Sequence, residues 1–124
     1  MMKFSPFILS LFVFISANTV LATDNEEIEY LLSFIASSNC VFIRNGSEHE
    51  AGEARDHLEM KYNHVKKRIK SADMFIEKIA AQSSITRRKY RVRCGGKEFA
   101  TEKWLKDALA AHRASTKGKR GEGQ

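Results

Sequence analysis

The chain has 124 residues and carries 21 lysines and arginines against 15 aspartates and glutamates, for a formal net charge of +6. This length predicts one domain, and the charge favours anionic partners. The two cysteines lack CxxC spacing, which excludes a thioredoxin-like redox motif, and no GxSxG or HExxH motif occurs.

Residues 1–22 have the pattern of a secretory signal peptide. Lys3 precedes an apolar run over residues 4–21, and small Ala22 ends it at a site suited to signal peptidase. The alternative is an uncleaved membrane anchor, since a run of about 18 residues is near the lower limit for a span. We expect cleavage after Ala22. The mature chain would be periplasmic, or secreted if the source has no outer membrane, and would not be an integral membrane protein.

Both cysteines, Cys40 and Cys94, lie in the mature chain. An even pair in a small exported domain predicts a disulfide, with two free buried cysteines as the alternative. Because the closed loop is long, the crosslink would contribute about 4 kcal/mol in the chain-entropy model.

The first half of the mature chain predicts a helix, a buried strand and a second helix. Asp24 and Glu27 have capping-box spacing and open a first apolar-striped helix. A short strand over residues 40–43 then meets the turn formers Asn45-Gly46. A second capping box, Ser47 with Glu50, predicts the start of the longest helix, whose apolar face comprises Ala51, Ala54, Leu58, Tyr62, Val65 and Ile69.

The second half predicts two more helices and one more strand. Ser71 caps a third helix, residues 89–94 alternate as a half-buried strand, and Thr101 caps the last helix. Residues 115–124 contain no apolar side chain and predict a disordered basic tail. The expected fold is mainly α (α+β), with about four helices on a small two-stranded sheet and one disulfide. Its domains are the signal peptide (1–22), one globular domain (23–114) and the tail (115–124).

Four stretches follow one another along the chain: CVFIRNG, EARDHLEMKY, SADMFIEKIA and SSITRRKYRVRC, before a Trp-Leu pair in the last helix. Together they resemble the YfeK-like family of small exported bacterial proteins of unknown function, over about residues 26–113. Members commonly carry SSxTGxPY, where this chain has Arg87 for the glycine and Lys89 for the proline. The resemblance implies a periplasmic, helical, single-domain protein and assigns no activity.

His49, Glu53 and His57 follow one another at four-residue spacing on the second predicted helix. Imidazole and carboxylate groups one turn apart are able to hold a divalent metal, and Glu53 with His57 would suit an acid–base enzyme. The alternative is a helix surface stabilised by pairs between side chains. Because no further ligand or nucleophile motif is evident, we assign no catalytic residue and no metal or other cofactor, and the enzyme remains the second hypothesis.

Arg44 lies where the first predicted strand meets its turn. It would bind either a carboxylate of a ligand or an acid of its own chain, Glu53 or Asp56. The internal pair is favoured, because these acids lie within the first turns of the following helix.

The densest basic segment contains Arg87, Arg88, Arg91 and Arg93. Export argues against nucleic acid as its partner, and the alternative is a solvated strand face whose charges discourage edge pairing. We therefore expect a binding module rather than an enzyme. Its partner would be an envelope protein, an anionic lipid or a cell-wall polymer.

Overall fold

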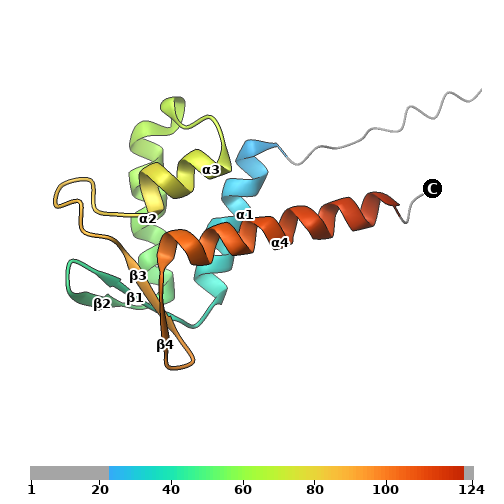
Figure 1. The fold of residues 1–124 in the computed structure, drawn as a ribbon. Coiled ribbons are helices and arrows are strands. Elements are labelled where there is room, and N and C mark those ends of the chain that lie inside the picture. The colour runs from blue at the N-terminus through green and yellow to red at the C-terminus, as the bar shows by residue number, and fades with distance from the viewer. Residues whose placement is uncertain (1–22, 122–124) are drawn as a thin grey trace, which may run out of the picture.

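The computed structural model describes residues 23–121. The predicted signal peptide therefore lies outside the described residues, as do residues 122–124. Within residues 23–121, no helix combines the length and the hydropathy that crossing a membrane requires. The elements follow in the order α1 (Asp24–Ser37), β1 (Val41–Arg44), β2 (Ser47–His49), α2 (Ala51–Val65), the 3-10 turn η1 (Lys66–Arg68), α3 (Ala72–Phe75), the π-helical turn η2 (Ile76–Ala80), β3 (Arg91–Cys94), β4 (Lys97–Ala100) and α4 (Thr101–Gly121) (Figure 1).

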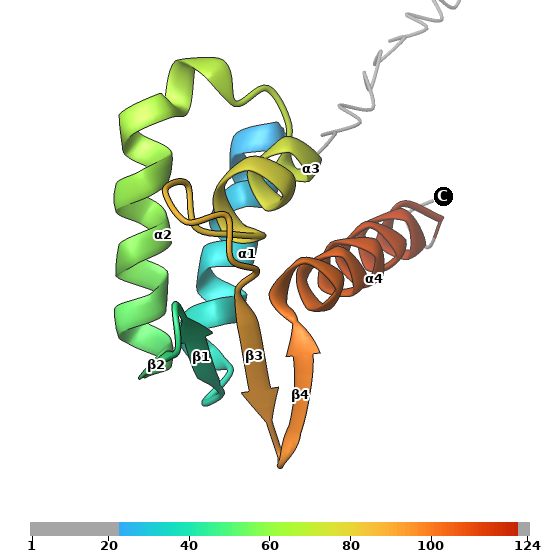
Figure 2. The same cartoon turned by 60° about the vertical axis from the view of Figure 1, so that its left-hand side comes forward.

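The sheet has four antiparallel strands in the order β2-β1-β3-β4, so the prediction of two strands was wrong (Figure 2). The two glycine-containing pairs are hairpin turns rather than ends of strands. Asn45 and Gly46 have φ of 50° and 79°, and Gly95 and Gly96 have φ of 56° and 81°. Two successive residues with positive φ match the right-handed twist of the flanking strands. Each turn thus adds a short outer strand to the predicted inner one.

The first hairpin also corrects the predicted start of the long helix. Ser47 pairs with Arg44 as part of β2 and does not cap a helix. Glu50 is the N-cap of α2 and forms no side-chain capping bond. The capping box of α1 lies one residue earlier than predicted, because Thr23 and Glu26 exchange its two hydrogen bonds. The cap predicted at Ser71 is confirmed by its hydroxyl, which accepts from the Met74 amide at 3.0 Å.

The core lies between the helices and one face of the sheet. Phe42 of β1 and Val92 of β3 are paired across the two inner strands, and both are buried. Trp104 of α4 packs against Phe42 and Phe34, with ring centroids 5.6 and 4.7 Å away. The apolar stripes predicted from helical spacing supply most of the remaining core, which includes Ile28, Leu31, Leu32, Ile35, Ala51, Ala54, Leu58, Tyr62, Phe75, Ile76, Leu105 and Leu109.

The predicted disulfide between Cys40 and Cys94 is confirmed. Cys40 immediately precedes β1 and Cys94 ends β3, and the adjacent residues Val41 and Arg93 are paired in the sheet. The crosslink therefore joins the two inner strands at one end, and it closes a separation of 54 residues. The disulfide thus connects the segment that follows α1 covalently to the end of β3, in addition to the contacts that both make with the core.

The last helix continues to Gly121, beyond the domain end predicted at residue 114 (Figure 1). An ion pair attaches its middle to α1. Nε and Nη2 of Arg113 donate to the two carboxylate oxygens of Glu27 at 2.7 and 2.9 Å, and Nη2 also donates to Asp73 at 3.0 Å. The Glu27 side chain is only 8% exposed. Arg113 therefore neutralises a carboxylate that α1 carries into the core.

Replacement of Arg113 by alanine should destabilise the fold by about 2 kcal/mol, because it leaves the buried Glu27 carboxylate without its bidentate partner. Urea unfolding at neutral pH measures this loss. The double variant Glu27→Gln/Arg113→Ala is the control and should recover part of the stability. A loss below about 0.5 kcal/mol in the single variant would show that the pair is only a surface contact.

Candidate functional site

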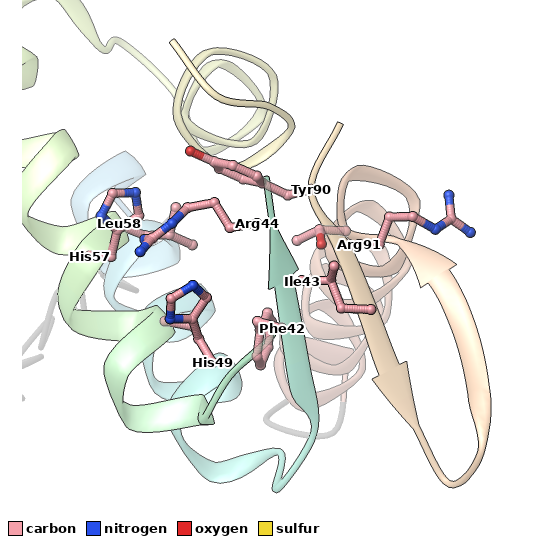
Figure 3. Close-up of a pocket in the computed structure, with 10 residues that line it drawn as sticks. Phe42, Ile43, Arg44, His49, His57, Leu58, Tyr90 and Arg91 are labelled. Atoms are coloured by element: carbon pink, nitrogen blue, oxygen red, sulfur yellow. The ribbon is translucent and has the colours of Figure 1, made fainter. Parts of the chain in front are cut away.

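Arg44 projects from the end of β1 toward α2, between His57 and Tyr90 (Figure 3). Within the described part of the chain it forms no ion pair and no side-chain hydrogen bond. The acids predicted as its partners are engaged elsewhere: Glu53 with His49 at 2.9 Å, and Asp56 with Arg55 at 3.2 Å. The prediction of an internal pair was therefore wrong. His49 ends β2, four residues before Glu53, and its ring binds that carboxylate.

Lys61, one helical turn after His57 on α2, has an ammonium group that is enclosed by oxygen atoms of other segments. It donates to the carbonyls of Ile79 and Gln82 at 2.8 and 3.1 Å and to the Tyr90 hydroxyl at 3.1 Å. It also lies 4.9 Å from the centre of the Tyr90 ring. No carboxylate takes part, so its charge is solvated but not neutralised.

The pKa values of the cluster are shifted by burial and, to a smaller extent, by this excess of positive charge. The pKa of His57 falls from 6.5 to about 4, first because of burial and then because of Arg44, Lys61 and His49. The pKa of Lys61 falls from 10.5 to about 8 through burial and repulsion from Arg44. Burial raises the pKa of Tyr90, and Arg44 opposes that rise. Two cations and a neutral imidazole thus face each other at pH 7.

A small cavity adjoins this cluster and is lined in part by Arg44, His49, His57 and Tyr90 (Figure 3). Its interior offers about 20 Å³, which is room for about one water-sized group. Two buried polar atoms on its wall, Nε2 of His49 and Oγ1 of Thr101, have no hydrogen-bond partner among residues 23–121. A larger ligand would therefore contact Arg44 from the opening of the cavity rather than from inside.

The candidate metal ligands His49, Glu53 and His57 do not converge. His49 uses Nδ1 to contact Glu53, whereas the ring of His57 lies edge-on to Tyr90 at 6.4 Å between centroids. Across residues 23–121, no group of three or more His, Cys, Asp or Glu side chains is arranged to hold a metal ion. No hydrogen bond joins Glu53 to His57 in that range, so the geometry brings no support for an acid–base pair.

The basic segment divides into a neutralised half and an open half. Arg91 pairs with Glu98 of β4, and Arg93 pairs with Glu48 of β2, each at 2.8 Å. Figure 3 shows Arg91 pointing away from Arg44 and His57. Both acids come from β2 and β4, the two strands that the sequence did not reveal. The ion pairs between these acids and the arginines were therefore not foreseeable.

Arg87 and Arg88 form the open half. Both are exposed and pair with no acid in the described region. Arg88 lies over the β1–β2 turn, because a Cβ added to Gly46 would be 3.8 Å from both of its terminal nitrogens. The loop between η2 and β3, which contains both arginines, is held by the buried Ser83 hydroxyl. This hydroxyl accepts hydrogen bonds from the Ile85 and Thr86 amides at 3.3 and 3.2 Å. Arg88 is thus placed beside the turn that follows Arg44.

Two residues of the cluster, Lys61 and Tyr90, were not singled out from the sequence. Tyr90 lies on the inward side of the predicted alternating strand, which indicates burial but no function. Lys61 belongs to the polar flank of α2, and nothing in its neighbours along the chain indicates that carbonyls 18 and 21 residues away surround it.

Replacement of Lys61 by methionine should lower the free energy of unfolding by about 2 kcal/mol, because it removes three hydrogen bonds and leaves their buried acceptors unpaired. The matched control is Lys67→Met in η1, where the lysine is exposed and donates no recorded hydrogen bond. Urea unfolding of both variants makes the comparison. Equal stability of the two would contradict a bridging role for Lys61.

NMR titration of the imidazole signals should place the pKa of His57 near 4, and Arg44→Gln should raise it part of the way toward 6.5. Burial, the larger cause, persists in that variant. Because folding lowers this pKa, the unfolded chain takes up the proton first, so His57 weakens the fold as pH falls from 6.5 toward 4. A His57 that titrates near 6.5 in the folded protein would show that the cluster is not electropositive.

Residues 22–113 match the model of a family of unknown function, DUF5329. The uncharacterised protein YfeK of Salmonella typhimurium is 37% identical over 70 residues, which cover 56% of this chain and 58% of that relative. The match thus spans less than two thirds of the relative's length. No solved structure matches the chain. With most of its described residues covered by the family model, this chain belongs to the DUF5329 family, and its sequence is YfeK-like.

Proposed function

We propose that the protein is an exported binding module that holds an anionic group of a cell-envelope component at Arg44. The observation that carries the proposal is the cluster of Arg44, His57 and Lys61, which no carboxylate of residues 23–121 neutralises. Charged groups that are partly withdrawn from water are ordinarily paired. An anion supplied by a partner would complete this site.

Each member of the cluster contributes differently to anion binding. Arg44 offers a planar guanidinium whose donors match two oxygens of a carboxylate, sulfate or phosphate. Lys61 has already used its three donors, so it contributes charge rather than contacts. His57 is neutral at pH 7 and becomes a third cation when a bound anion favours its protonated form.

Arg88, beside the β1–β2 turn, and its neighbour Arg87 extend the positive potential outward. Exposed cations of this kind accelerate association with an anionic surface and make it sensitive to salt. The signal-peptide pattern of residues 1–22 would bring the module to the envelope. There, acidic proteins, anionic lipids and cell-wall polymers all carry suitable groups. The acid–base enzyme has no comparable support, because Glu53 is 63% exposed and bound to His49.

Sulfate is a suitable first probe, because its charge does not change over the range in which His57 titrates. Sulfate should raise the pKa of His57, since an adjacent anion stabilises the imidazolium, and linkage then requires tighter sulfate binding as pH falls. NMR titration of His57 with and without sulfate measures both effects. Chloride at equal ionic strength controls for screening.

The variant Arg44→Gln should abolish the sulfate-dependent shift, and it should fold because Arg44 forms no bond that the fold requires. The matched control is Arg93→Gln, which removes an arginine already paired with Glu48 and should leave the shift intact. A sulfate response that survives loss of Arg44, or an absence of response in the unmodified protein, would overturn the proposal.

A further inference from the structure

A second hollow lies between the end of α2 and the α3–η2 helix. Its volume is about 570 Å³, within the range of sites that hold small organic ligands. Four aliphatic side chains line it: Val65 and Ile69 from the end of α2 and its connection, and Met74 and Ile79 from the opposite helix. The connection leaves the groove open, because α2 ends at Val65 and α3 begins only at Ala72.

The local backbone explains why Val65, Ile69 and Met74 are not fully covered. After η1, Ile69 is extended, with φ of −94° and ψ of 109°, so the chain crosses the gap without filling it. Val65 and Ile69 are only partly buried and pack against the core from the side. Figure 2 shows this connection arching over the space between α2 and α3.

The rim of the groove is cationic. Arg68 and Lys78 are exposed on opposite sides, and Lys61 lies at the inner end with its ammonium bound to carbonyls. Neither Arg68 nor Lys78 pairs with an acid within residues 23–121, and no Asp or Glu lines the groove. An apolar floor with an unneutralised cationic rim is complementary to one ligand chemistry, an apolar chain that ends in an anion.

We propose that this groove binds a single acyl chain bearing a carboxylate or phosphate head group. The chain lies along Val65, Ile69 and Met74, and the head group is held between Arg68 and Lys78. This site is separate from the one at Arg44, although Lys61 borders the groove and also bonds to Tyr90 beside Arg44. A neutral apolar ligand fits less well, because it would leave the cationic rim without a counter-charge.

Four amphiphiles of equal chain length test the head group: dodecanoate, dodecyl phosphate, dodecanol and dodecyltrimethylammonium, with dodecanol below its solubility limit and the others below their micelle concentrations. Calorimetry should show one-to-one binding of the two anions, with dodecanol and the cation weaker by about tenfold or more. The tighter of the two anions identifies the head group as carboxylate or phosphate. Binding of dodecanol as tight as that of the anions, or no binding of either anion, would overturn the proposal.

Charge reversal locates the site. The double variant Arg68→Glu/Lys78→Glu should lower the affinity for the more tightly bound anion about tenfold. The matched control is Lys97→Glu/Lys117→Glu, which makes the same charge change on β4 and α4 and should leave that affinity unchanged. Methyl signals of Val65 and Ile69 should shift on binding.

Arg44→Gln should leave the affinity for the anion within about twofold of that of the unmodified protein, which separates this test from that of the Arg44 site. Loss of amphiphile binding in Arg44→Gln, or its persistence in the groove variant, would contradict the assignment.

Discussion

The ammonium group of Lys61 is the contact on which the arrangement of the cluster depends. It joins α2 to the end of the π-helical turn and to Gln82, two places where carbonyls lack partners within a helix, and to the Tyr90 hydroxyl. A cation at the carboxyl end of a helix is favoured by the helix dipole and satisfies those carbonyls. One partly buried lysine thereby orients α2, the α3–η2 helix and the segment before β3 relative to one another.

This arrangement has an electrostatic consequence. Lys61 is bound through carbonyls and a phenol rather than a carboxylate, so the fold retains its full positive charge. Arg44 adds a second unneutralised charge, and the depressed pKa of His57 reflects both cations as well as burial. Several other charges are paired with each other, as at Glu27 with Arg113 and at Arg93 with Glu48. Arg44 and Lys61 thus remain without a carboxylate partner in the described part of the chain, and one of them lines each of the two hollows.

The helices and the disulfide were predictable, whereas the outer strands and the cluster were not. Helical spacing identified most buried side chains, and an even cysteine pair in a domain predicted to be exported indicated the crosslink. The outer strands, Ser47–His49 and Lys97–Ala100, are too short and polar to show an alternating pattern, and only the hairpin turns create them. Their acids, Glu48 and Glu98, then neutralise arginines that the sequence presents as an open basic strand. The bonds of Lys61 are non-local, so no pattern along α2 distinguishes it from a solvated lysine.

In the proposed function, Arg44 is kept free of internal acids so that an external anion is able to bind it. Crystals soaked in selenate test this most directly, because selenium gives an anomalous signal that ordered water does not. The account predicts an anomalous peak within hydrogen-bond distance of the Arg44 guanidinium, beside His57. An Arg44 bonded to Glu53 or Asp56 of its own chain, with selenate found only at other arginines, would contradict it.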